Sequence, residues 1–227
     1  MRRIIPGIAF LVCTTNVFAQ FALQSGDLLF HVGKGSALGE AIAQVTSGAG
    51  NVNYTHVGIV SVEDGNVFVI EATTPSVRKV AVDTFLNDAR KINGLPMVAV
   101  GRLQSKYHGI IPQAIKNAGT YIGKPYDYVF SPDNDAYYCS ELVQLSFKDK
   151  RGKPVFTTRK MTFKDDTGRT PRAWEEHFAE HNAPVPEGRP GTNPGDLSKS
   201  KEITIVYRYF DSAVPAWPLP GQQDGGE

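Results

Sequence analysis

An Asp-Gly pair between two β-rich runs is the feature that most restricts how this chain can fold. Asp64-Gly65 separates residues 55–62 from residues 66–73, and both runs are rich in Val and Ile. Asp-Gly between such runs is the strongest short-range signal for a β-hairpin with a two-residue turn. Two long strands joined in this way must pair antiparallel. The sequence therefore predicts an antiparallel sheet built around this hairpin.

The other predicted elements mix helices and strands without regular alternation. Further strands are expected at residues 28–31, 77–82, 97–103 and 202–210. Helices are expected at residues 37–45, 83–89, 110–123, 139–147 and from 171 to about 178, and residues 184–200, rich in Pro and Gly, are expected to form a loop. Because strands and helices do not alternate as βαβα, the sequence predicts an α+β fold.

The N-terminus has the pattern of an export signal. Met1-Arg2-Arg3 is basic, the stretch that follows is apolar, and Ala19 offers a small residue for cleavage before Gln20. We expect a signal peptide over residues 1–19, a catalytic domain over 20–211 and a loose tail over 212–227. A membrane anchor and a lipoprotein modified at Cys13 are the alternatives. No later segment is apolar enough to cross a membrane.

Charge and composition exclude some partners. The chain has 24 Lys and Arg against 23 Asp and Glu, a formal net charge of +1, and no basic block. Nucleic acid is therefore not an expected partner. His177 and His181 are one helical turn apart, so a metal-binding pair is one interpretation of them. The neighbouring glutamates favour the other interpretation, a solvent-exposed helix face. No metal or other cofactor is predicted.

Cys139 is the only cysteine expected in the mature protein, because Cys13 lies in the predicted leader. An exported protein usually pairs its cysteines, so an unpaired one indicates an intermolecular disulfide or a reactive thiol. Cys139 precedes an apolar run that is predicted to be helical. The positive end of a helix favours thiolate over thiol. We therefore interpret Cys139 as a candidate nucleophile.

The hairpin supplies the partners that such a nucleophile needs. If Glu63 faces Asn66 across the turn, His56 faces Thr73 and Glu71 is its diagonal neighbour on the same face. Glu71 interrupts an apolar run, and a carboxylate there indicates a partner. The alternative is a polar residue at the end of a strand, and a bulge in the turn would break the register. We predict His56 as the general base and Glu71 as the residue that orients it.

An acyl transfer also needs donors for the oxyanion. The backbone N–H of Cys139 is the first predicted donor. Tyr54, Tyr137 and Tyr138 are candidates for the second, and we include Tyr54 and Tyr138 among the predicted substrate-binding residues. Of the remaining histidines, His31 ends a predicted strand and is expected to line a cleft.

Several motifs together resemble the NlpC/P60 cysteine peptidases. Gly26-Asp27-Leu28-Leu29-Phe30 and His56-Val57-Gly58-Ile59-Val60 resemble the paired segments GDLVF and HVGI, and Tyr138 to Val143 resembles DCSGLV around the nucleophile. The histidine precedes the cysteine, which is the order of the circularly permuted, YiiX-like branch with a papain-like fold. That branch also has a Tyr-x-Gly-x-Pro-Tyr-Asp segment, matched by residues 121–127. The resemblance covers residues 24 to 150.

The resemblance implies a nucleophile helix packed on a small antiparallel sheet and a Cys/His/polar triad. It also implies an exported, periplasmic or extracellular hydrolase of amide bonds, with cell-wall (murein) peptides as the expected substrate. A lipid acyl hydrolase or acyltransferase on the same triad is the second hypothesis, and a non-catalytic binding module is the third. Asp27 and Asp127 are either turn residues or ligands for the free amine of a stem peptide. Residues 191–197 are a candidate for a loop beside the cleft.

Overall fold

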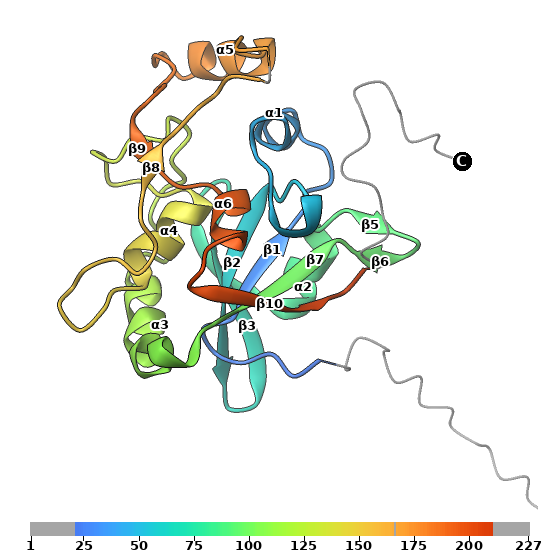
Figure 1. Cartoon of the computed structure of the whole chain (residues 1–227), viewed down its shortest axis with the longest axis vertical. Helices are drawn as coiled ribbons and strands as arrows, with labels where there is room; N and C mark the ends of the chain where they lie inside the picture. The colour runs from blue at the N-terminus through green and yellow to red at the C-terminus, as the bar shows by residue number, and fades with distance from the viewer. Residues whose placement is uncertain (1–20, 166, 211–227) are drawn as a thin grey trace, which may run out of the picture.

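One six-stranded sheet forms the centre of the molecule (Figure 1). The computed structural model describes residues 21–165 and 167–210. In spatial order the strands are β10 (Ile203–Arg208), β7 (Val98–Leu103), β1 (Leu28–His31), β2 (His56–Glu63), β3 (Asn66–Ala72) and β4 (Val77–Ala81). Every neighbouring pair is antiparallel, so the predicted α+β class is confirmed.

The helices cover both faces of this sheet. They are α1 (Ala37–Val45), α2 (Val82–Asp88), α3 (Ile111–Thr120), α4 (Cys139–Ser146), α5 (Arg172–Glu180) and α6 (Pro194–Ser198), with 3₁₀ turns at Ala49–Asn51 and Ser105–Ile110. Two small ribbons pair β5 (Lys91–Ile92) with β6 (Leu95–Pro96), and β8 (Arg159–Lys160) with β9 (Pro190–Gly191). Buried residues of every helix except α2 share one apolar cluster, while α2 packs on the opposite face.

The predicted hairpin is present with the predicted register. Glu63 pairs with Asn66, and Ile59 pairs with Ile70 further along. Asp64 and Gly65 have φ angles of 50° and 80°, as a type I′ turn requires. There is no bulge at the turn, so the side chains alternate between faces as expected.

The alternation along β2 places each face against a different helix. Val57 and Ile59 join the cluster that contains Leu142 and Val143 of α4. On the other face, Gly58 lets β2 approach its neighbour, because a Cβ there would lie 2.3 Å from a methyl of Val69 and 2.9 Å from the Phe85 ring of α2. Because β2 is closely packed against helices on both faces, the position of its first residue, His56, is fixed.

The prediction of a loop over residues 184–200 is wrong in part. This segment contains β9 and α6, and α6 packs on α4. Asn193 caps α6 by accepting a hydrogen bond from the Asp196 backbone N–H at 2.7 Å, and Pro194 occupies the first turn. A capping side chain followed by proline is a helix-start signal. The Pro and Gly content of the surrounding segment concealed it.

The predicted signal peptide (residues 1–19) and tail (212–227) lie outside the described residues. Within the part of the chain that is described, none of the helices has the length and apolar character needed to cross a membrane.

Candidate active site

His56 and Glu71 lie on neighbouring strands and are joined by a hydrogen bond. His56 is the first residue of β2 and Glu71 is near the end of β3. The distance from His56 Nε2 to Glu71 Oε2 is 2.5 Å, and Glu71 is only 2% exposed. This is the diagonal contact that the hairpin register predicts. Because Nε2 is engaged by the carboxylate, Nδ1 is the nitrogen that remains for another partner.

Arg78 of β4 holds the other oxygen of Glu71. Arg78 stands opposite Glu71 in the sheet, and its Nε donates to Glu71 Oε1 at 2.9 Å. Its guanidinium also reaches Asp88 at the end of α2, at 3.1 Å. Burial raises the pKa of the Glu71 carboxyl, but His56 and Arg78 outweigh it and lower that pKa to about 2. Glu71 is therefore charged at neutral pH.

Cys139 is the first residue of α4 and is buried beside His56. The residue before it, Tyr138, has extended backbone, and its side chain does not cap the N–H groups of the first turn. Burial lowers the pKa of His56. Hydrogen bonds and electrostatic interactions with Cys139 and Glu71 outweigh it and raise that pKa to about 10. His56 is therefore a protonated imidazole at neutral pH, held between a sulfur and a carboxylate.

Tyr126 is a site residue that the sequence analysis did not assign. It is 9% exposed, and burial, followed by the electrostatic interaction with Cys139, raises its pKa well above the usual value. Its phenol therefore keeps its proton and is a hydrogen-bond donor. The backbone of Tyr126 bridges to Tyr137, two residues before the cysteine. Its position within the Tyr-x-Gly-x-Pro-Tyr-Asp motif was the available signal.

The ring of His31 packs against the ring of His56. The two ring centroids are 4.7 Å apart, and His31 stacks on Phe85 at 4.8 Å. Burial, and then the charge of His56, lower the pKa of His31 well below its usual value. His31 is thus a neutral ring packed against a charged one. Its Nδ1 has no hydrogen-bond partner among the described residues.

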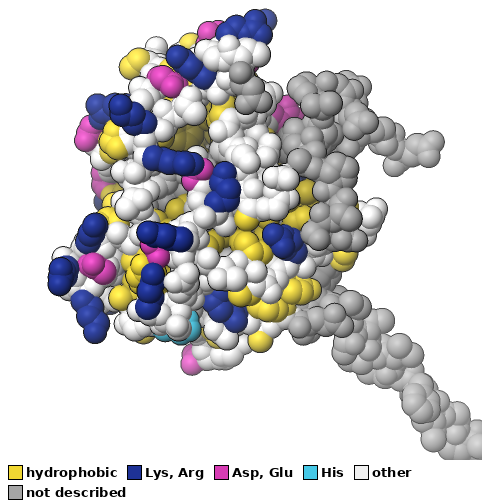
Figure 2. Space-filling model, viewed as in Figure 1, with side chains coloured by type: hydrophobic (Ala, Val, Ile, Leu, Met, Phe, Trp, Pro, Cys, Tyr) yellow, Lys and Arg dark blue, Asp and Glu magenta, His cyan; other side chains and the backbone are white. Residues whose placement is uncertain are grey.

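Two hollows meet at the Cys139–His56 pair. Cys139 lines a cavity of about 450 Å³, and His56 and Glu71 line a groove of about 300 Å³. Ile42, Thr55 and Tyr126 belong to both walls. Figure 2 shows one face of the molecule, where apolar side chains lie in a hollow bordered by Lys and Arg. The nucleophile and the base are therefore both open to small molecules.

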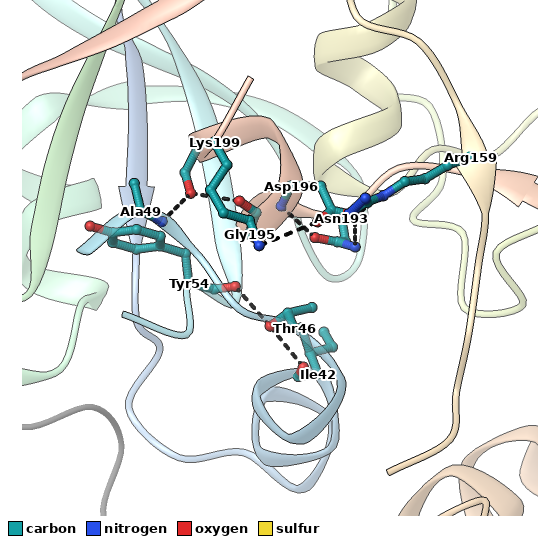
Figure 3. Close-up of polar contacts among 10 residues, drawn as sticks. Ile42, Thr46, Ala49, Tyr54, Arg159, Asn193, Gly195, Asp196 and Lys199 are labelled. Atoms are coloured by element: carbon teal, nitrogen blue, oxygen red, sulfur yellow. Dashed lines mark hydrogen bonds and ion pairs between the residues drawn. The ribbon is translucent and has the colours of Figure 1, made fainter. Parts of the chain in front are cut away.

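The segment that was predicted to lie beside the cleft does line the cavity. Gly191, Thr192, Asn193, Pro194 and Asp196 are all in its wall. Figure 3 shows how polar contacts fix this segment against its surroundings.

On one side of α6, Arg159 of β8 binds Asp196. On the other side, the Ala49 N–H donates to Ser198 Oγ at 2.9 Å (Figure 3). The mouth of the cavity is thus tied to both β8 and the loop after α1.

Only one of the four predicted substrate-binding residues lines the cavity. Tyr138 does, and its hydroxyl accepts a hydrogen bond from the Thr192 N–H at 3.2 Å. Tyr54 is fully buried against Phe30, outside the walls of both hollows.

The two aspartates have structural partners instead. Asp27 forms a two-pronged ion pair with Arg102, at 2.8 and 2.7 Å, beside β1. Asp127 accepts hydrogen bonds from the N–H groups of Val129 and Ser131, which shapes the turn after Tyr126. Neither aspartate lines the cavity or the groove.

Comparisons with known proteins identify the family of this chain and a solved structure with a similar fold. A family model described as "Permuted papain-like amidase enzyme, YaeF/YiiX, C92 family" matches residues 22–207. The chain is 24% identical to "Uncharacterized protein YiiX" of Escherichia coli (strain K12) over 196 residues, which is 86% of this chain and 88% of that protein. A solved structure described as "metalloprotein yiiX" from Escherichia coli O157:H7 has a TM-score of 0.67 and 22% identity, and the match covers 83% of this chain and 98% of that one. The similarity to this solved structure shows the fold alone.

Proposed function

The chain belongs to the family of permuted papain-like amidases of the YaeF/YiiX type, and on that premise we propose that Cys139 is its nucleophile, His56 its general acid–base and Glu71 the residue that orients the histidine. The family is one of papain-like cysteine amidases, so the reaction is hydrolysis of an amide bond. The observation that carries the assignment is the His56 imidazole, held at Nε2 by Glu71 and hydrogen-bonded to Cys139.

In the first half of the proposed reaction, the Cys139 sulfur attacks the amide carbonyl carbon while His56 holds the proton. The oxyanion accepts hydrogen bonds from the backbone N–H of Cys139 and from the Tyr126 hydroxyl. The C–N bond then breaks, the amine leaves with the proton from His56 Nδ1, and a thioester remains on Cys139.

In the second half, His56 takes a proton from water, and the resulting hydroxide attacks the thioester carbon. The C–S bond breaks, the carboxylic acid leaves, and Cys139 and His56 return to their starting states. Glu71 keeps its charge throughout and fixes the orientation of the imidazole.

We also propose that the enzyme acts outside the cytoplasm, after removal of residues 1–19. This proposal rests on the pattern of residues 1–19. N-terminal sequencing of the secreted protein is then expected to give Gln20 as the first residue. Two substrate classes follow from the sequence analysis, murein peptides and the acyl groups of lipids. The largely apolar walls of the cavity beside Cys139 favour an acyl group of low polarity, which reverses the order of those two classes.

The E. coli O157:H7 protein of the solved structure is described as a metalloprotein. Among the described residues of this chain, no group of three or more His, Cys, Asp or Glu side chains is arranged to hold a metal ion. In the alternative pair, each histidine has one ring nitrogen on a backbone carbonyl: His177 Nε2 contacts the Tyr128 carbonyl at 2.6 Å, and His181 Nδ1 contacts the His177 carbonyl at 2.8 Å. The proposed steps use no metal.

Hydrolysis of an amide with a chromogenic amine tests the proposal. We expect turnover by wild-type protein and its loss in Cys139→Ala and His56→Gln, while His108→Gln, a histidine remote from both hollows, keeps it. Iodoacetamide is expected to label Cys139 rapidly near neutral pH, and more slowly in His56→Gln. Turnover that survives Cys139→Ala would refute the assignment, as would an unreactive thiol.

A further inference from the structure

His31 is a buried histidine of the active site to which the proposed reaction gives no role. It is 6% exposed, and it lines the groove of about 300 Å³ together with His56 and Glu71. The sequence predicts that His31 lines a cleft, and the structure confirms this. It does not belong to the wall of the cavity beside Cys139. His31 therefore faces the part of the site that contains the general acid–base.

The central sheet fixes the position of the His31 ring. His31 is the last residue of β1, and it stands directly opposite His56 in the antiparallel ladder between β1 and β2. Residues opposite each other in such a ladder point to the same face of the sheet. The ring contacts His56, at a centroid distance of 4.7 Å, and stacks on Phe85 at 4.8 Å. Its two nitrogens therefore have fixed surroundings.

The two nitrogens of His31 differ in their access to the groove. Nδ1 is enclosed and has no hydrogen-bond partner among the described residues. Nε2 is not enclosed in this way, and the described residues give it no hydrogen bond either. Nε2 is therefore the nitrogen that is open to the groove.

The neutral ring of His31 carries one proton, and the burial of Nδ1 decides where it lies. A buried N–H group without an acceptor is the rarer and more costly kind of unpaired polar group. On Nε2 the same proton can be donated to a molecule in the groove. Burial and the charge of His56 lower the pKa of His31 well below its usual value, so the ring does not compete with His56 for a proton. His31 thus offers a neutral N–H donor beside a charged one.

The proposed reaction places the amine half of the substrate in this groove. The amine leaves with the proton of His56, so it departs beside that imidazole and therefore beside His31. The remaining wall is polar and includes Thr73, Thr74 and the Arg78 guanidinium, whose side chain is 40% exposed. Two rings 4.7 Å apart can contact the nitrogen and the carbonyl oxygen of one amino-acid residue at the same time.

We propose that His31 is a substrate-binding residue, whose Nε2–H donates a hydrogen bond to a carbonyl or carboxylate oxygen on the amine half of the substrate. It thereby selects amines derived from amino acids over simple alkylamines. This rests on the proposed function, because the role of His56 decides which half of the substrate occupies the groove. It also explains why a histidine with an unpartnered nitrogen stands where a phenyl ring would avoid that cost.

Two amides with one acyl group and amine halves of the same shape test the proposal. N-hexanoylglycinamide carries a carbonyl oxygen in its amine half, and N-hexanoylisobutylamine carries a methyl group in its place. The wild-type protein is expected to hydrolyse the glycinamide with a kcat/KM about tenfold higher, the contribution of one hydrogen bond. His31→Phe, which keeps a ring against Phe85, is expected to bring the ratio of the two values close to one.

Two further variants show whether the donor or the ring is responsible. His31→Gln, whose side-chain amide can still donate, is expected to keep part of the ratio. His108→Phe makes the same exchange at an exposed position outside both hollows, and it is expected to keep the ratio in full. The urea midpoint of His31→Phe is expected not to fall, since the exchange removes a buried unpartnered nitrogen.

The ¹⁵N resonances of the His31 ring give a measurement that needs no turnover. They are assigned by their loss in His31→Phe and recorded in Cys139→Ala at neutral pH. We expect the proton on Nε2, and a shift of the Nε2 resonance on addition of N-hexanoylglycinamide that the isobutylamine amide does not produce. A proton on Nδ1 would contradict the proposal.

The outcomes separate the role of His31 from the proposed function. Cys139-dependent hydrolysis with the same ratio in wild type and His31→Phe overturns the role of His31 and leaves the proposed function standing. Hydrolysis that persists in Cys139→Ala overturns both. If neither amide is hydrolysed, an Nε2 resonance that does not move with the glycinamide overturns the role of His31.

Discussion

The ion pair between His56 and Glu71 makes a quantitative prediction for Glu71→Gln. The pKa of Glu71 falls from 4.5 to about 2 in the folded protein. Each unit of pKa difference corresponds to about 1.4 kcal/mol, so the folded state favours the carboxylate by about 3 kcal/mol. The change for His56, from 6.5 to about 10, is larger because it also includes Cys139. The value from Glu71 is therefore the better measure of what the carboxylate contributes.

The two pKa changes set the pH range of this stabilisation. The folded pKa of Glu71 is lowered, so its contribution is complete above about pH 4.5 and is lost as the pH falls towards 2. The folded pKa of His56 is raised, so its contribution is complete below about pH 6.5 and is lost as the pH rises towards 10. The pair thus stabilises the fold most between about pH 4.5 and 6.5.

We expect Glu71→Gln to lower the free energy of unfolding by about 3 kcal/mol at pH 6, with a smaller difference from wild type at pH 3 and at pH 9. Urea unfolding followed by the fluorescence of buried Trp174 measures this. Glu63→Gln is the matched control, because Glu63 is an exposed carboxylate of the same hairpin paired with Lys79, and its unfolding midpoint is expected to stay nearly unchanged. A difference below about 1 kcal/mol at pH 6, or one that grows between pH 4 and 2, would refute the reasoning.

Three further substitutions test other parts of the site. Tyr126→Phe is expected to lower kcat about 100-fold with little change in KM, since it removes one oxyanion donor; an unchanged kcat in steady-state assays would remove Tyr126 from the mechanism. Gly58→Ala is expected to cost about 2 kcal/mol or more in thermal unfolding, because the new methyl would overlap Val69, and a neutral result would mean that β2 and β3 can separate. Asn193→Ala is expected to cost about 1 kcal/mol through loss of the α6 cap, and equal urea midpoints for the two proteins would contradict that.

Those parts of the fold and site that depend on local spacing could be predicted. The Asp64-Gly65 turn sets the hairpin register, and the register alone brings Glu71 to His56. The position of Cys139 at a helix start also followed from the apolar pattern after it. Each of these relations spans few residues, so propensity and alternation are sufficient to establish it.

Contacts between distant segments could not be predicted in this way. Arg78 reaches Glu71 because β4 pairs with β3, and no short turn signal between those strands revealed that register. Tyr126 and His31 come to the site through the packing of whole elements. The β5–β6 ribbon, by contrast, has a local Asn93-Gly94 signal in a type I′ turn that was not used.

The origin of the cavity wall has a consequence for how such enzymes diverge. His56 and Glu71 stand on the central sheet, but much of the wall of the cavity beside Cys139 comes from residues 159–163 and 191–199, which belong to none of its six strands. Insertions or substitutions in those two stretches can change the shape of the cavity while His56 and Glu71 keep their strand register. Selection for a new substrate can therefore act on one part of the gene while the chemical machinery is inherited unchanged in another.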